Sequence, residues 1–186
     1  MTWRRALDWV GTIVLAIVFV LVFEAEVAKP YRIPSSSMEP TLHCARPGAW
    51  CESSFNDRVL VNRLAYRFGS PSRGQIVVFK APPATSRCEP GDAGSTFVKR
   101  LIGLPGDTVT ERNGFVSVDG RPLRESYVEF RDHESGRWHV PAGEYFFMGD
   151  DRIHSCDSRV WGSVPRKNLV GPVLLTYWPP GRISLH

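Results

Sequence analysis

The chain has 186 residues, a formal net charge of +4 and a hydrophobic share of 42%. This length suits one domain of ordinary size with a core of its own. Its basic residues are spread along the sequence and form no stripe interleaved with aromatic residues, which argues against a nucleic-acid partner. The small positive excess is compatible with a domain that lies beside anionic lipid.

An apolar segment lies near the N-terminus. Residues 9–23 carry no charge, and Arg4 and Arg5 precede them. As a helix this run covers about 22 Å at ~1.5 Å per residue, whereas the hydrocarbon layer of a bilayer is ~30 Å thick. Flanking small and apolar residues extend the run if Asp8, Glu24 and Glu26 reach toward the interfaces. The segment predicts one transmembrane helix.

Two other interpretations of this segment fit less well. A cleaved secretory signal needs small residues one and three places before the cut, but a cut after Ala28 has Glu26 in the third place and a cut after Ala25 has Phe23. A buried core helix needs a polar stripe, which is missing. We therefore expect a retained anchor.

The arginines before the anchor predict its orientation. Positive residues stay on the cytoplasmic side of a membrane, so the remainder of the chain emerges on the outer face. The expected division is a cytoplasmic N-terminus with the anchor in residues 1–28, and an extracytoplasmic domain in residues 29–186.

Four cysteines, Cys44, Cys51, Cys88 and Cys156, lie in the outer part of the chain. In an oxidising compartment they allow two disulfides in three possible pairings. Free thiols remain an alternative. A zinc site is disfavoured because no C-x-x-C pair and no paired histidine spacing is present. The sequence predicts no metal and no cofactor.

Beyond the anchor, short β-rich runs alternate with turn signals, and helical periodicity is largely absent. We therefore expect a mostly β fold: a compact β-sheet domain behind one N-terminal transmembrane helix. Residues 115–118 alternate between the turns Asn113-Gly114 and Asp119-Gly120, which predicts a hairpin. Residues 57–68 read as a strand that leads into a short helix. The other expected strands are 75–80, 96–102, 108–110, 144–148 and 173–178.

A serine run between Pro34 and Pro40 is the first candidate for chemistry. The two prolines restrict the backbone of this run. A solvated linker is the usual meaning of such composition, but apolar side chains on both sides favour an ordered segment. A serine hydroxyl becomes a nucleophile only when a neighbouring group takes its proton.

A histidine or a neutral lysine can serve as the base for such a serine. None of the five histidines lies in a G-x-S-x-G elbow or has an evident Asp partner, so they read as surface residues. Burial of a lysine disfavours its ammonium form and lowers its pKa. Lys99 lies among apolar residues in 97–103. The alternative for Lys99 is an ordinary surface lysine at the edge of a half-buried strand.

A third segment, residues 149–159, follows an apolar strand and is dense in hydrogen-bonding groups. By itself it reads as a turn. Asp157 and Arg159 can form a charge-assisted pair that stiffens it.

Together and in this order, these segments resemble the type I signal peptidases, membrane-bound Ser–Lys proteases that remove signal peptides from exported proteins. The matching stretches are IPSSSMEPTL (33–42), GQIVVFK (74–80), FVKRLIGLPGD (97–107) and GDDRIHSCDSRVWGSVP (149–165). The sequence departs from the family pattern at Gln75, where the family usually has Asp, and at Asp151, where it usually has Asn.

The resemblance implies a role for each matching residue. Ser37 matches the nucleophile and Lys99 the general base. Ser35 matches the hydroxyl that binds the oxyanion together with the backbone N–H of Ser37. Ser155 matches the serine that orients the lysine amine. The supporting ion pair corresponds to Asp157 and Arg159, and the substrate pocket to Tyr31, Ile33, Met38, Leu42, Val78, Phe97 and Val98.

The resemblance also implies substrates and a location. The expected substrates are preproteins cut after small residues in an Ala-x-Ala-like pattern, at the outer, periplasmic face of a bacterial inner membrane, with membrane lipid as a second partner. A dedicated relative that matures pilins or conjugation components is the nearest alternative. Outside the family, a self-cleaving Ser–Lys regulator and a non-enzymatic, membrane-tethered β binding module were also considered.

Overall fold

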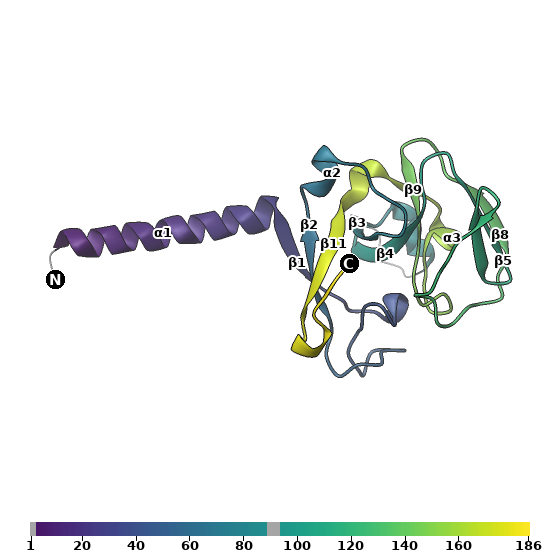
Figure 1. Ribbon diagram of the computed structural model, residues 1–186, viewed down its shortest axis with the longest axis horizontal. Coiled ribbons are helices and arrows are strands. Elements are labelled where there is room, and N and C mark those ends of the chain that lie inside the picture. The colour runs from purple at the N-terminus through teal and green to yellow at the C-terminus, as the bar shows by residue number, and fades with distance from the viewer. Residues whose placement is uncertain (1–2, 89–93) are drawn as a thin grey trace.

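The computed structural model describes residues 3–88 and 94–186, so residues 1–2 of the expected anchor region lie outside it. The first element, α1 (Trp3–Glu26), extends away from the remainder of the chain (Figure 1). The large apolar residues described between Trp9 and Leu21 are all at least half exposed. By length and hydropathy, no helix in the described part of the chain qualifies as a membrane span. The expected transmembrane helix therefore stays a prediction.

The chain beyond α1 is mostly β, as expected. Eight strands form one sheet in the order β1-β2-β11-β3-β4-β9-β10, with β12 beside β11, and every neighbouring pair is antiparallel. These strands are β1 (Ala28–Arg32), β2 (Arg58–Asn62), β3 (Ile76–Lys80), β4 (Thr96–Gly103), β9 (Glu144–Met148), β10 (Val164–Pro165), β11 (Leu169–Trp178) and β12 (Ser184–Leu185).

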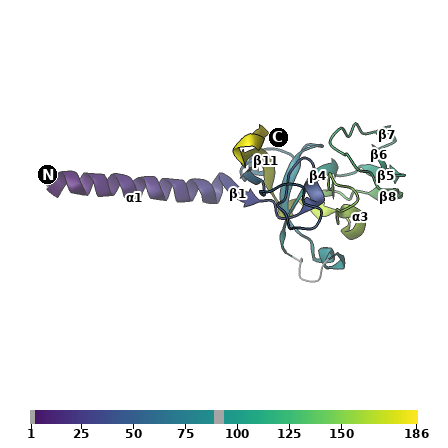
Figure 2. The ribbon, with the colours of Figure 1, turned by 90° about the horizontal axis from the view of Figure 1, so that it is seen from below.

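A second, four-stranded sheet lies at the end of the molecule away from α1 (Figures 1 and 2). Its order is β7-β6-β5-β8, and its strands are β5 (Thr108–Arg112), β6 (Phe115–Val118), β7 (Arg121–Pro122) and β8 (Gly136–His139). The predicted hairpin is confirmed. Asn113 and Gly114 have φ of 52° and 78°, and Asp119 and Gly120 have 50° and 76°, as tight primed turns require.

The remaining helices are single turns that join the strands. Two are α-helical, α2 (Ala65–Phe68) and α3 (Ser158–Trp161), and four are 3-10 turns, η1 (Ser36–Met38), η2 (Pro83–Arg87), η3 (Arg166–Asn168) and η4 (Pro180–Arg182). The carboxylate of Asp157 caps α3 by accepting the backbone N–H of Arg159 at 3.2 Å. The expected strand-then-helix arrangement of residues 57–68 is confirmed by β2 and α2.

The core forms on both faces of the large sheet because β3 is buried on both sides. Ile76 and Val78 belong to one apolar cluster, and Val77 and Phe79 to another. A third cluster fills the space between the two sheets, with Ile102 and other residues of β4, β9, β5 and β6. The alternation of side chains along a strand explains why neighbouring residues enter different clusters.

The sequence patterns missed some elements for identifiable reasons. Strand β11 begins at Leu169, four residues before the expected start. The sequence did not predict this part of the strand because Gly171 and Pro172 lie inside it, and both residue types are unusual within strands. A Cβ at position 171 would collide with the carbonyl oxygen of Asn62, so only glycine allows this close approach to β2. Strand β8 was missed because Gly136–His139 shows no clear apolar alternation.

The four cysteines form two disulfides, Cys44–Cys51 and Cys88–Cys156, with Cα–Cα distances of 5.0 and 6.1 Å. The first closes a short loop after the serine run. The second joins the end of η2 to the 149–159 segment. Free thiols and a zinc site, the alternatives left open by the sequence, do not describe these cysteines.

Candidate active site

A cleft of about 300 Å³ lies between β1, the serine run and the edge formed by β3 and β4. Strands β3 and β4 pair side by side, with Val78 opposite Val98, so both residues reach the same wall of the cleft. The cleft is lined by seven of the predicted residues, Tyr31, Ile33, Ser35, Ser37, Val78, Phe97 and Val98. Four lining residues that the sequence did not single out are Arg32, Pro34, Ser95 and Thr96.

Ser37 lies in the single turn η1 and is 6% exposed. Its Oγ is 3.4 Å from the Oγ of Ser35, which is extended and exposed. The backbone N–H of Asp151 donates to the carbonyl oxygen of Ser37 at 3.3 Å. The serine run is therefore an ordered turn attached to the 149–159 segment, and not a solvated linker.

Met38 and Leu42 do not line the cleft. Both side chains are fully buried in the apolar cluster beneath it, where they pack with Ile33 and Val78. They form the support of the cleft wall, while the wall itself comes from the residues above them.

Lys99, the predicted base, is buried. It lies on β4, which contacts η1, and its side chain is only 2% exposed. Burial lowers the pKa of Lys99 to about 8, although the negative charge of Asp157 acts in the opposite direction. The alternative of a surface lysine is therefore wrong.

Ser155 lies in the loop after β9, and its buried Oγ has no hydrogen-bond partner among the described residues. Gly149 lets this loop approach the serine run. A Cβ at position 149 would collide with the Oγ of Ser155 and with the carbonyl oxygen of Ser37. The structure thus brings the Oγ of Ser155 and the carbonyl oxygen of Ser37 close to one point, the place where a Cβ of residue 149 would stand.

Asp157 and Arg159 form the predicted ion pair. Nε of Arg159 lies 2.8 Å from Oδ1 of Asp157, and Nη2 lies 2.9 Å from Oδ2. Burial alone would raise the pKa of Asp157, but the hydrogen bonds and charge of Arg159 outweigh it and hold the pKa below its usual range. Asp157 also accepts the backbone N–H of Gly149 at 3.1 Å, so the pair fixes the start of the loop.

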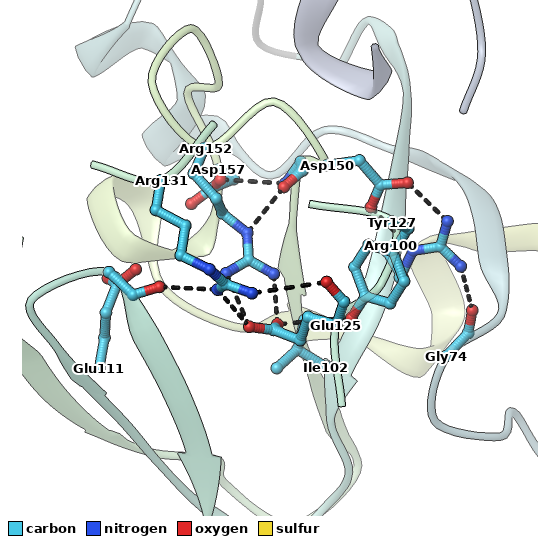
Figure 3. A network of polar contacts seen from close by, with 12 residues as sticks. Gly74, Arg100, Ile102, Glu111, Glu125, Tyr127, Arg131, Asp150, Arg152 and Asp157 are labelled. Atoms are coloured by element: carbon cyan, nitrogen blue, oxygen red, sulfur yellow. Dashed lines mark hydrogen bonds and ion pairs between the residues drawn. The ribbon is translucent and has the colours of Figure 1, made fainter. Parts of the chain in front are cut away.

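A buried ionic network behind the loop was not predicted (Figure 3). Arg152 is fully buried, pairs with Glu125 and donates from Nε to the carbonyl oxygen of Gly149 at 3.0 Å. Arg131 approaches the other oxygen of Glu125 at 2.9 Å. Glu111 lies 3.6 Å from Arg159, and burial raises the pKa of Glu111 to about 7. One sequence signal for this network was available: Glu111 lies two residues after Val109, on the buried side of β5.

A second buried pair holds β4 beside Lys99. Nε of Arg100 lies 2.7 Å from Oδ1 of Asp150, and the other carboxylate oxygen accepts the hydroxyl of Thr41 at 2.6 Å. The guanidinium of Arg100 lies over the ring of Tyr127 at 3.9 Å (Figure 3). These contacts join β4, the serine run and the 149–159 loop at a point next to the lysine.

One histidine, His154, differs from the expectation that no histidine has an Asp partner. His154 has a carboxylate partner, since its Nδ1 lies 2.9 Å from Oδ2 of Asp151, and its ring stacks on Trp50 at 4.1 Å. This pair was not predicted, because the conformation of the turn determines whether two residues three positions apart face each other. His154 is not among the residues that line the cleft.

One group among the described residues, Glu39, His43 and Glu52, has potential metal-ligand atoms within 4.8 Å of one another. Internal contacts account for this arrangement. Glu39 accepts the backbone N–H of Cys44 at 3.0 Å and contacts the ring of His43 with its other oxygen. We assign no metal to it.

The family model for signal peptidase, peptidase S26, matches residues 6–178. The chain belongs to the signal peptidase family. It is 38% identical to signal peptidase I of Leptolyngbya laminosa over 96% of this chain and 82% of that protein. It is 35% identical to signal peptidase I of Mycobacterium tuberculosis over 91% of this chain and 71% of that protein.

A solved structure is also similar. The signal peptidase I of Enterococcus faecalis shares 30% identity and covers 55% of this chain and 96% of its own, with a TM-score of 0.47. The family matches confirm the resemblance, the activity expected from it and the enzyme class: the chain is a serine peptidase of the type that removes signal peptides. A non-enzymatic binding module is therefore set aside.

Proposed function

We propose that this signal peptidase works through a Ser–Lys dyad, with Ser37 as nucleophile and Lys99 as general base. The observation that carries the proposal is the burial of Lys99 on the strand whose neighbouring residues, Phe97 and Val98, line the cleft with Ser37. A pKa of about 8 leaves an appreciable neutral fraction of the Lys99 amine near neutral pH.

The proposed reaction is an acyl transfer in two steps. The neutral amine of Lys99 takes the hydroxyl proton of Ser37, and Oγ attacks the scissile carbonyl. The Ser35 hydroxyl and the Ser37 backbone N–H donate to the oxyanion. The resulting ammonium gives its proton to the leaving amine. Water then hydrolyses the acyl-enzyme with the same amine as base.

Ser155 is the proposed positioning residue for the lysine. Its Oγ is buried and lacks another partner among the described residues, so it is able to accept a hydrogen bond from the Lys99 amine. The Asp157–Arg159 pair supports this arrangement by holding both ends of the loop that carries Ser155.

The proposed specificity is for small side chains near the cut. The cleft has a volume of only about 300 Å³, and its walls are mostly apolar, with Ile33, Val78 and Val98 among them. Such walls accept an Ala-x-Ala-like segment as an extended strand and leave little room for large side chains.

We further propose that α1 anchors the enzyme in a bacterial inner membrane, with residues 1–28 as cytoplasmic end and anchor and residues 29–186 as the domain on the outer face. In support, the large apolar side chains described on α1 are at least half exposed, and α1 extends away from the domain (Figure 1). We propose the general role of the family, the processing of preproteins, with a dedicated enzyme for pilins or conjugation components as the alternative.

The proposal is tested with Ser37→Ala and Lys99→Met in the full-length protein. Each is expected to lower kcat/KM on a preprotein by about 10³-fold or more, because nucleophile and base act as one unit. The methionine keeps the volume of the buried side chain, and thermal melting checks the fold. Arg112→Met, at an exposed cation on the distant small sheet, is the control. Mass spectrometry of the wild-type product gives the cut position. Near-normal turnover of Lys99→Met would exclude Lys99 as the base.

A further inference from the structure

A basic cavity of about 660 Å³ lies outside the cleft. Four of the cations that line it carry the argument: Arg63 just before α2, Lys80 at the end of β3, and Arg166 and Lys167 in η3. Arg67 of α2 lines it as well. Among the described residues, no carboxylate lines it. A concave site with charge of one sign concentrates the electrostatic potential and attracts an ion of the opposite sign.

The cavity wall is ordered by neutral groups. Nη2 of Arg166 donates to the carbonyl oxygens of Tyr66 and Gly69 at 3.0 and 2.8 Å, and Nη1 donates to the hydroxyl of Tyr145 at 3.1 Å. The side-chain amide of Asn168 donates to the carbonyl oxygen of Lys80 at 3.0 Å. These bonds hold two of the cationic segments in place without supplying a negative charge.

The position of the cavity points to the ligand. The backbone N–H of Arg63 donates at 2.9 Å to the carbonyl oxygen of Val27, the residue directly after α1. Figure 1 shows α2 on the side of the domain where α1 ends. The cations therefore lie at the height where a helix anchored in a bilayer would leave the hydrocarbon and cross the layer of lipid phosphates.

An apolar cavity adjoins the same end of α1. Phe19 and Val20 of α1 face Leu60, Leu175 and Tyr177 of the large sheet around a space of about 480 Å³. Apolar side chains next to the helix and cations beside its end match the two layers of a bilayer surface, acyl chains and phosphates.

We propose that the basic cavity binds the phosphate of an anionic phospholipid headgroup. Guanidinium groups suit this ligand because their N–H fork matches two phosphate oxygens, and the lysines add point charges. The proposal rests on the proposed anchoring of α1, since the anchor brings the cavity to the lipid surface. Such a site would orient the domain on the membrane as well as attract it.

The test uses full-length protein in neutral detergent. Binding of dihexanoyl-phosphatidylglycerol below its micelle-forming concentration is measured by calorimetry, with dihexanoyl-phosphatidylcholine and inorganic phosphate as comparison ligands. The variant Arg63→Glu, Lys167→Glu is expected to bind the anionic lipid about tenfold more weakly or worse, because two attractive charges become repulsive. Arg112→Glu, Arg121→Glu, an exposed pair in the distant small sheet with the same change in net charge, is expected to keep wild-type affinity.

Three results would overturn the proposal. An equal loss of lipid affinity in both double variants would indicate a general charge effect, and equal affinity of the wild type for the anionic and the neutral lipid would exclude recognition of the headgroup charge. Equal affinity of the wild type for the anionic lipid and for inorganic phosphate would indicate a free-anion site. Cleavage of a short peptide in detergent is expected to be unchanged in both variants. Flotation of the wild type with purely neutral vesicles tests the anchor separately, so a failed anchor is distinguished from a failed headgroup site.

Discussion

Lys99 shows how a single residue acquires an unusual property from its position in a strand. On β4, Phe97 and Val98 before it line the cleft and Leu101 and Ile102 after it are buried in the core, and the lysine side chain is itself only 2% exposed. Desolvation disfavours the ammonium, and Asp157 only partly offsets the effect. The result is a lysine that changes protonation state within the range where the enzyme is assayed.

The first prediction concerns the pH dependence of activity. Because the neutral amine is the active form, kcat/KM is expected to rise about tenfold per pH unit below pH ~8 and to level above it. A free lysine would place this limb near ~10.4. The measurement is a pH–rate profile with a soluble peptide substrate. A limb near pH ~6.5 that disappears in His154→Ala or His43→Ala would assign the base to a histidine instead.

Stability gives an independent check on the same residue. The folded state holds the Lys99 pKa near 8, below the ~10.4 of the unfolded chain, so the unfolded state binds more protons between these values. The contribution of Lys99 to the free energy of unfolding therefore rises with pH across this window. Lys99→Met is expected to remove that part of the slope, measured by denaturant unfolding at pH 7.5 to 10.

Gly149 carries a second residue-scale prediction. Gly149→Ala is expected to lower kcat/KM on the order of 10²-fold, because the new Cβ displaces either Ser155 or the Ser37 backbone and small displacements of reacting groups cost about that much. Gly181→Ala is the control, since its Cβ meets nothing within 4 Å. Wild-type activity of Gly149→Ala would contradict the close approach of the two serines at this glycine.

At the scale of elements, the loop after β9 is held by the small sheet. Arg152 and Arg159 of this loop pair with Glu125, Asp132 and Glu111, which follow or belong to strands of the small sheet. Arg152 and Glu125 are both buried, so each neutralises the other in a place that water does not reach. The loop that carries Ser155 thus depends on a separate part of the fold.

Glu125→Ala is therefore expected to destabilise the protein by about 3–5 kcal/mol, because it leaves the Arg152 guanidinium buried without its carboxylate. Activity of the fraction that remains folded is expected to fall as well. Glu129→Ala, an exposed glutamate in the same connection, is expected to change the free energy of unfolding by less than about 0.5 kcal/mol. Urea denaturation of both variants makes the comparison. Similar values for both would show that the pair contributes little.

At the scale of the whole molecule, the cleft lies close to the end of α1. Tyr31 lines the cleft only five residues after Glu26, at most about 18 Å along an extended chain at ~3.5 Å per residue. Trp50, 66% exposed, stacks on His154 beside Ser155 and is available to enter a lipid interface. An anchored enzyme would therefore present its cleft near the membrane surface.

A form without residues 1–26 keeps all of β1, whose five residues pair with β2, so it is expected to fold. It is expected to cut a short peptide normally but a full-length preprotein poorly in plain buffer, because the membrane no longer brings enzyme and substrate together. Adding vesicles is expected to recover part of the kcat/KM on the preprotein. Equal rates on the preprotein with and without vesicles would show that proximity to the membrane is incidental.

Several features followed from the sequence because they depend on residues close together in the chain. Asn113-Gly114 and Asp119-Gly120 predicted their turns because these residue types tolerate positive φ. The apolar runs predicted β3, β4 and β9, since strands buried on both faces need continuous apolar sequence. The family was recognisable because its motifs are short contiguous segments.

Other features were decided only by the tertiary structure. The pairing of Cys88 with Cys156 joins residues 68 positions apart, and local pattern carries no information on such contacts. Glu125 and Arg152 carry no local pattern that indicates burial, yet the fold encloses both side chains. The low pKa of Lys99 has the same origin: its desolvation depends on packing between segments far apart in the sequence, since β4 pairs with β3 and β9 and contacts η1.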